Sequence, residues 1–391
     1  MDIDTGSRKR APRKLLRVAA LAGLLALAAC GASGGSGASG GGAPMMGQAD
    51  AGQSKAAGNN PDLDTGTSLG GAAAPDIKLT NQFGQPMSMS QFRGKVVILA
   101  FVDSECTTIC PLTTVSMVQA RQLLGAAGQQ VQLLGVDANP DATAVRNVMA
   151  YSQAHAMVNQ WDFLTGSDAQ LKAVWQAYHI YVQVEQGDID HTPALFVIDQ
   201  RGREREIYLT TMAYASVGQE AQVLAQETAS LLPGHPTLAR ESSLAYISGI
   251  GPTARATLNE VPSGSVTLGP GKPHLLMFFA TWLSETSDLR TGLTGLNAYA
   301  KAAQRDGLPP LTAIDEAVSE PSVATVQAYL QHLGQPLSYP VALDTTGRLA
   351  DGYGVQDQPW FTLTNASGKI VWTHDGWLSP SALESAVRAK S

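Results

Sequence analysis

Two of the chain's three cysteines are spaced closely enough to act on one metal ion or on each other. Cys106 and Cys110 stand in the run D-S-E-C-T-T-I-C-P, between an apolar segment and a helical pattern. At the start of a helix, an i, i+4 spacing brings both sulfurs onto one face, where they could share a metal or oxidise to a disulfide. The helix N-terminus also favours thiolate over thiol. A structural disulfide and a reactive or metal-binding pair both fit this pattern.

One histidine is a candidate partner for these thiols. His191 directly precedes a predicted strand at 194–199, which we expect beside the cysteine loop. Two soft thiolates with one imidazole suit Cu(I) and can also hold Cu(II), whereas structural zinc usually requires a fourth protein ligand. Asp137 and Asp190 either orient the imidazole and close the metal entrance, or are ordinary strand-end carboxylates.

The third cysteine, Cys30, belongs to an export signal. Residues 1–17 are rich in arginine and lysine, and 18–29 form an apolar run too short to span a bilayer. The run ends L-A-A-C, which resembles the lipobox of bacterial lipoproteins. We therefore expect removal of a signal peptide at 1–29, lipid attachment to Cys30 and a place in the cell envelope, on a membrane that the sequence does not identify.

Charge and composition narrow the range of partners. The formal net charge of −7 supplies no polycation for phosphate backbones, so nucleic acid is excluded as a partner. Residues 30–75 consist mainly of glycine, alanine, serine and glutamine, the composition of a flexible linker.

The apolar patterns predict α/β architecture. The run at 95–102 is typical of a central strand buried on both faces, and a helical pattern follows at 111–124. Further strands and helices alternate to about residue 232, which predicts a layered α/β domain at 76–232. After an interdomain segment at 233–262, a similar order with matching offsets recurs at 263–391.

The first of these two domains resembles the Sco/SenC family of copper-binding, thioredoxin-like proteins. The resemblance rests on F-x-x-x-x-C-x-x-x-C-P after a buried strand, then G-V-D, W-D-F-L-T-G, and D-H-T before a strand. It implies that Cys106, Cys110 and His191 bind copper for delivery to the dinuclear copper centre of cytochrome c oxidase. The sequence departs from the family at Glu105, where histidine is frequent, and at Thr107, where proline is usual.

Pro193, two residues after His191, takes the place of the cis-proline that thioredoxin-type oxidoreductases hold opposite their cysteines. Redox exchange by Cys106 and Cys110 as a disulfide-forming pair therefore stays open. A peroxidase is disfavoured, because Asp103 stands where peroxiredoxins carry a proline.

The second domain resembles a thioredoxin whose active site has been lost. The run T-W-L-S-E-T places Leu283 and Thr286 where the two cysteines of T-W-C-x-x-C would stand, and Asp357 matches the position of His191. The expected fold is therefore two thioredoxin-like domains in tandem. The second one either docks a partner through a groove lined by Trp282, Pro359 and Trp360 or only stabilises the chain.

The sequence thus predicts a lipid-anchored copper chaperone of the cell envelope. Its partner would be the copper-centre subunit of cytochrome c oxidase or another envelope copper or thiol protein. The alternatives are a thiol-disulfide oxidoreductase that keeps a partner's cysteines reduced, and a non-catalytic binding or scaffold protein.

Overall fold

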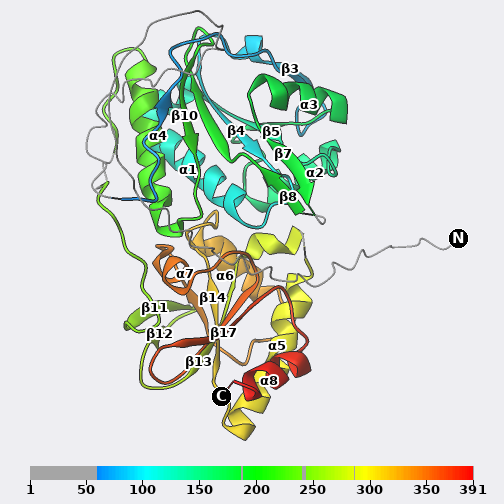
Figure 1. Cartoon of the computed structure of the whole chain (residues 1–391), viewed down its shortest axis with the longest axis vertical. Coiled ribbons are helices and arrows are strands. Elements are labelled where there is room, and N and C mark those ends of the chain that lie inside the picture. The colour runs from blue at the N-terminus through cyan, green and yellow to red at the C-terminus, as the bar shows by residue number, and fades with distance from the viewer. Residues whose placement is uncertain (1–59, 186–187, 240–243, 286, 391) are drawn as a thin grey trace, which may run out of the picture. The chain divides into compact units, whose positions relative to one another are not determined.

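The structure, a computed structural model, describes residues 60–185, 188–239, 244–285 and 287–390. Two mixed β-sheets with helices packed against their faces make up this part of the chain, as the α/β pattern predicts (Figure 1). The predicted signal peptide, Cys30 and most of the predicted linker lie outside the described residues. Within the described ranges, no helix has the length and apolar character needed to cross a bilayer.

The first sheet is built around β4, whose seven residues are all buried. β4 runs parallel to β5 and antiparallel to β9, and β6 continues the parallel half beyond β5. In spatial order the strands are β1 (Thr67–Ser68), β10 (Glu204–Leu209), β9 (Ala194–Ile198), β4 (Val96–Val102), β5 (Val131–Asp137) and β6 (Asp162–Leu164). β1 lies within the segment predicted as linker, where it pairs with β10.

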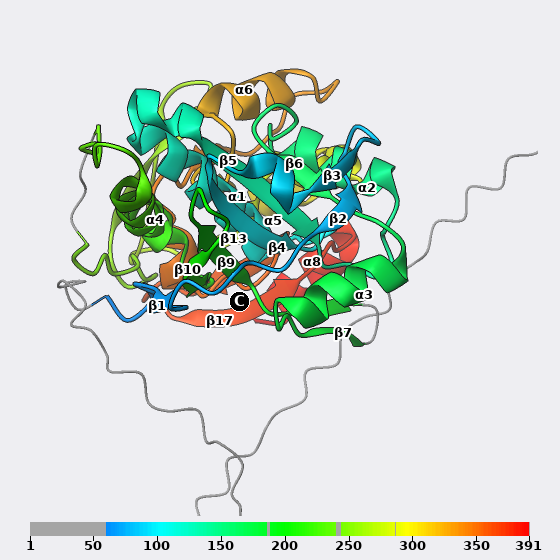
Figure 2. The same cartoon turned by 90° about the horizontal axis from the view of Figure 1, so that it is seen from above.

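Side chains of β4 alternate between two apolar cores. Ile98 and Ala100 face a core that includes α1 and α4, which lie side by side on one face of the sheet (Figure 1), whereas Leu99 and Phe101 face a core that includes α3. Seen from above, α3 lies on the side away from α4 (Figure 2). The helical segments here are η1 (Met89–Phe92), α1 (Ile109–Leu123), η2 (Gly125–Gln130), α2 (Val145–Ala154), α3 (Asp168–Ala177), η3 (Tyr214–Ser216) and α4 (Val217–Leu231).

Two hairpins are attached to this sheet. β2 (Lys78–Thr80) pairs with β3 (Pro86–Ser88), and β7 (Val182–Glu185) pairs with β8 (Asp188–His191). β8 ends at His191, and two residues separate it from the start of β9 at Ala194. Because β9 is hydrogen-bonded to β4, the second hairpin delivers His191 to the edge of the sheet where the cysteine loop begins.

The second sheet repeats the central arrangement of the first. β13 runs parallel to β14 and antiparallel to β16, β15 extends the parallel half, and β17 lies beyond β16. In spatial order the strands are β12 (Ser265–Leu268), β11 (Ala256–Val261), β15 (Val341–Leu343), β14 (Leu311–Asp315), β13 (His274–Phe279), β16 (Trp360–Thr364) and β17 (Ile370–Asp375). The accompanying helical segments are η4 (Thr281–Glu285), α5 (Leu289–Asp306), α6 (Val323–Gln331), α7 (Arg348–Tyr353) and α8 (Pro380–Arg388).

One apolar cluster joins the two halves of the described chain, which belong to one compact unit. On β13, Met277 faces a core that includes α5 and α8, while Phe278 faces a cluster that also contains Leu112 of α1 and Tyr214 of η3. The backbones approach closely at Gly347, where a Cβ would lie 2.4 Å from the Tyr214 carbonyl carbon. One face of the second sheet thus packs against α5 and α8, and the other against a cluster that combines α7 with residues of the first domain.

Candidate functional site

Cys106 and Cys110 lie at the junction between β4 and α1. Thr108 is the N-cap of α1 but makes no side-chain cap hydrogen bond. Instead, the Sγ of Cys106 accepts from the backbone N–H of Cys110 at 3.4 Å, and the Thr108 hydroxyl lies 3.4 Å from the same sulfur. A sulfur that receives an N–H at the positive end of a helix is stabilised as thiolate.

The two thiols have unequal surroundings. Both are free; Cys106 is half-buried and Cys110 is buried. A hydrogen bond from the Cys110 side chain lowers the pKa of Cys106 and outweighs burial and the charge of Asp103, which raise it. Burial, and then the neighbouring Cys106, raise the pKa of Cys110 well above its ordinary value. Cys106 is therefore the more easily ionised sulfur, and Cys110 is the thiol that donates to it.

His191 faces Cys110. Its Nε2 lies 3.7 Å from the Sγ of Cys110, and its Nδ1 lies 3.1 Å from the carbonyl oxygen of Thr192. A carbonyl oxygen can only accept, so the proton is on Nδ1 and the lone pair of Nε2 points toward the sulfur. Burial is the main cause that lowers the pKa of His191, which keeps the imidazole neutral. A neutral imidazole with a free Nε2 lone pair is the form that binds metals.

The three predicted ligands are neighbours but do not form a closed set. Cys110 contacts His191, whereas the sulfur of Cys106 is turned toward the helix N-terminus. Within the described ranges, no three histidine, cysteine or acidic side chains are grouped closely enough to hold a metal ion. A three-ligand site therefore requires the Cys106 sulfur to rotate away from the Cys110 N–H and toward the imidazole.

Asp103 shapes this loop, and the sequence reasoning did not identify it. Its carboxylate accepts from the backbone N–H of Glu105 at 2.8 Å and from Nδ2 of Asn139 at 2.7 Å, while its carbonyl accepts from the N–H of Cys106 at 3.1 Å. Its charge also raises the pKa of both thiols. An aspartate that directly follows a buried strand and turns back on its own backbone is the sequence signal that would have found it.

The two acidic residues predicted to support the site lie in different surroundings. Asp137 is fully buried at the end of β5, where it accepts from the N–H of Asn139 at 3.1 Å. Burial raises its pKa well above the ordinary value, which disfavours the ionised carboxylate. Asp190 is exposed, and its charge is a minor influence that raises the pKa of His191. The hydrogen-bond partner of the imidazole Nδ1 is the Thr192 carbonyl.

The prediction that Pro193 is a cis-proline is wrong. Among the described residues the cis peptide bonds are Val261–Pro262 and Gln358–Pro359. The hairpin sets the backbone before Pro193, because the N–H of Thr192 donates to the Tyr181 carbonyl and the N–H of Ala194 donates to the Thr192 carbonyl. The proline thus sits in a tight turn that aims His191 at Cys110.

The second domain carries no thiol at the matching loop. Leu283 and Trp282 of η4 are buried, and the indole N–H of Trp282 donates to the Ser319 hydroxyl at 3.2 Å. At the end of β14, Asp315 and Glu316 are fully buried, and burial raises both pKa values well above their ordinary range. Burial therefore disfavours the ionised form of both carboxyls, and the second domain has no cysteine in its sequence that could form a thiolate here.

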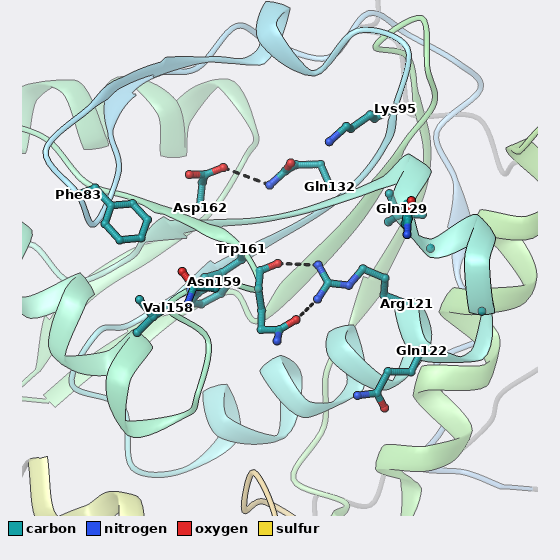
Figure 3. A pocket seen from close by; sticks show the side chains of 14 residues that line it. Phe83, Lys95, Arg121, Gln122, Gln129, Gln132, Val158, Asn159, Trp161 and Asp162 are labelled. Atoms are coloured by element: carbon teal, nitrogen blue, oxygen red, sulfur yellow. Dashed lines mark hydrogen bonds between the residues drawn. The ribbon is translucent and has the colours of Figure 1, made fainter.

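A polar cavity of about 630 Å³ lies elsewhere on the first domain. Its walls include Lys95, Arg121 and Trp161, and Figure 3 shows the Arg121 guanidinium directed at Gln160. The cavity lies near the C-terminal end of α1 and the start of β5, whereas Cys110 is at the opposite end of α1. The cavity is therefore separate from the cysteine site.

Comparison with known proteins assigns the first domain. Residues 67–226 match the family model described as SCO1/SenC. The SCO1 protein homolog of Bacillus subtilis is 23% identical over 133 residues, which are 33% of this chain and 69% of that protein. The mitochondrial SCO2 homolog of Bos taurus is 29% identical over 147 residues, 34% of this chain. That match spans only 52% of the bovine protein, and the mouse homolog is matched over 54%.

Solved structures of Sco proteins are also similar to part of this chain. Bradyrhizobium japonicum ScoI with copper bound is 19% identical, covering 41% of this chain and 100% of that one with a TM-score of 0.36. Apo Sco1 of Thermus thermophilus is 25% identical, covering 44% of this chain and 99% of that one with a TM-score of 0.38.

Proposed function

Because residues 67–226 form a SCO1/SenC domain, we propose that this chain is a copper chaperone of the cell envelope. Cys106, Cys110 and His191 hold the ion, and the acceptor is the copper-centre subunit of cytochrome c oxidase. The observation that carries the proposal is the contact of the Nε2 lone pair with Cys110, 3.7 Å from its sulfur, beside a thiol already biased toward thiolate. Sulfur, sulfur and imidazole nitrogen form a donor set suited to copper.

The residues around the ligands supply what copper transfer needs. The Thr192 carbonyl fixes the imidazole tautomer, and Cys110 loses its proton when the ion replaces the hydrogen bond to Cys106. Cys106 is half-buried, so a partner's thiolate can approach the ion from that side. Exchange of one sulfur ligand for another then moves the copper without freeing it into water.

The test is an anaerobic Cu(I) titration of the purified full-length chain, followed by oxidation to read the Cu(II)–thiolate absorption. We expect one tightly bound copper, with strong loss of retention in Cys106→Ala, Cys110→Ala and His191→Ala. His332→Gln, at the exposed C-cap histidine of α6, is the matched control. A His191→Ala chain that binds copper as tightly as the parent, with an unchanged spectrum, would show that the three-ligand assignment is wrong.

A thiol-disulfide reductase is the second candidate, favoured by the unequal pKa values of the two cysteines. In that reaction the Cys106 thiolate attacks a partner's disulfide and expels one partner thiolate. Cys110 then loses its proton, attacks the mixed disulfide and releases the reduced partner, leaving a Cys106–Cys110 disulfide. Reduction of insulin disulfides by a chain that fails to bind copper would favour this function over the chaperone.

Anchoring and the second domain complete the proposal. Lipid on Cys30 would hold the chain at a membrane, and Cys30→Ser is expected to abolish incorporation of a labelled fatty acid. The second domain is a thioredoxin-like copy without thiols, an inference supported by the strand arrangement that it shares with the first sheet.

A further inference from the structure

One hydrogen bond connects the proposed copper loop to the second domain. The hydroxyl of Thr107, which lies between the two cysteines, donates to Oδ1 of Asp357 at 2.8 Å. Asp357 is only 9% exposed, and the same oxygen accepts from the backbone N–H of Gln358 at 2.7 Å. The carboxylate is therefore held by its own backbone before it meets Thr107, and a buried hydrogen bond to a charged acceptor is among the stronger ones.

The surroundings of Asp357 keep it in place. The Gln358 side chain donates to Glu316, which is fully buried at the end of β14. The adjacent bond, Gln358–Pro359, leads directly into β16. Asp357 precedes Pro359 by two residues, as His191 precedes Pro193, so it occupies the position in the second domain that carries the histidine in the first.

Other contacts press the same two surfaces together. The rings of His155 and Trp282 lie 5.2 Å apart, which brings the end of α2 against η4. The backbone N–H groups of Tyr214 and Ala215 donate to the Asp351 carboxylate at 2.8 and 3.0 Å. The bond between Thr107 and Asp357 is thus formed across a packed contact, where little entropy is lost in making it.

We propose that Asp357 is a positioning residue of the copper site, supplied by the second domain. By holding Thr107 it fixes the loop between the two sulfurs, and the same bond in the copper-loaded chain slows the rotation of Cys106 back to the orientation seen here, which would release the ion. This inference rests on the proposed copper function, and it gives the domain without thiols a direct part in that function.

The experiment uses the full-length chain loaded with Cu(I), with the rate of copper transfer to a high-affinity Cu(I) chelator as the readout. Thr107→Val and Asp357→Ala are each expected to speed copper loss roughly tenfold, since each removes a buried charge-assisted hydrogen bond. The double variant should be no faster than Asp357→Ala alone, because that variant already removes the bond to Thr107. Thr107→Ser, which restores the hydroxyl, should bring the rate back toward the parent value. Asp168→Ala, at an exposed carboxylate of α3, is the surface control.

Rates within twofold of the parent in both single variants, or effects that simply add in the double variant, would overturn the proposal. If the parent chain binds no copper, the chaperone function is wrong. The alkylation rate of Cys106 in the metal-free chain then measures whether Asp357 positions the loop. A several-fold change in that rate in Thr107→Val and Asp357→Ala, but not in Asp168→Ala, supports positioning without copper. An unchanged alkylation rate of Cys106 in both variants would contradict the positioning role of Asp357.

Discussion

At the scale of single residues, the site depends on how two similar thiols differ. Cys106 accepts hydrogen bonds at the helix N-terminus, whereas Cys110 is buried and donates. The same sulfur of Cys110 also faces the imidazole of His191. Cys110 therefore connects the nucleophilic sulfur to the histidine, and its loss should alter both neighbours.

We expect Cys110→Ala to raise the pKa of Cys106, because the hydrogen bond from the Cys110 side chain is the largest cause that lowers it. At pH 7 the metal-free variant should react with iodoacetamide roughly 3- to 10-fold more slowly at Cys106, in proportion to its smaller thiolate fraction. The measurement is the alkylation rate across pH 6–10, which gives the pKa directly. A Cys106 pKa that is equal or lower in the variant would contradict this origin of the shift.

The sequence predicted which residues would meet but not how they would be oriented. The i, i+4 spacing and the strand after His191 were enough to bring Cys106, Cys110 and His191 to one edge, though their role as ligands remains a prediction. The role of Asp103 was missed because one of its partners is the side chain of the distant Asn139, and the trans peptide at Pro193 was missed because backbone hydrogen bonds of the hairpin set it. Such bonds leave no periodic trace in the sequence.

At the scale of elements, the helix that carries Cys110 is fixed to α4 by a half-buried glutamate. Glu220 accepts from the Ser116 hydroxyl on α1 at 2.9 Å and from the Thr210 hydroxyl at 3.0 Å. Burial raises the pKa of Glu220 from 4.5 to about 7. The proton that Glu220 carries is thus linked to folding.

Stability should fall as the pH rises from about 4.5 to about 7, because the folded chain holds a proton on Glu220 that the unfolded chain releases. The loss is at most about 3 kcal/mol, from the difference between the two pKa values. Urea unfolding of Glu220→Gln at several pH values should show a flatter dependence than the parent. Glu320, whose pKa is also raised to about 7, should leave a residual slope in the variant. Equal slopes in both chains would contradict the linkage.

The central elements were predictable because their apolar patterns are long. The strand expected at 131–137 is β5 at those bounds, and the helix expected at 111–124 is α1 at Ile109–Leu123. β1 and β11 were not expected, since 30–75 and 233–262 were assigned to connecting segments. β1 is exposed and β11 is partly exposed; β1 pairs with β10, and β11 pairs with β12 and β15.

At the scale of the whole molecule, the two domains share a core and touch at the backbone. Gly347 has a φ of 69°, and a Cβ there would lie 2.4 Å from the carbonyl carbon of Tyr214. Gly307 has the same φ, but nothing lies within 4 Å of its Cβ position. Alanine substitutions at Gly307 and Gly347 therefore distinguish the free-energy cost of a left-handed backbone from the additional cost of displacing the neighbouring domain.

Gly307→Ala should cost about 1 kcal/mol, the usual penalty for a side chain at positive φ. Gly347→Ala should cost that plus the displacement of the Tyr214 backbone, about 2 kcal/mol or more in total. Thermal unfolding of the two variants measures the difference. Equal destabilisation by Gly307→Ala and Gly347→Ala would mean that the Tyr214 backbone moves aside at no measurable cost.

The buried carboxyls have a consequence for how the protein behaves in an electric field. The formal charge of −7 counts every aspartate and glutamate as ionised. Burial raises the pKa of Asp137, Asp315 and Glu316 well above the ordinary values, so the folded chain holds these protons to a higher pH than the unfolded chain does. In the pH range where these three carboxyls titrate, the folded protein therefore carries less negative charge than its unfolded chain and should migrate more slowly toward the anode.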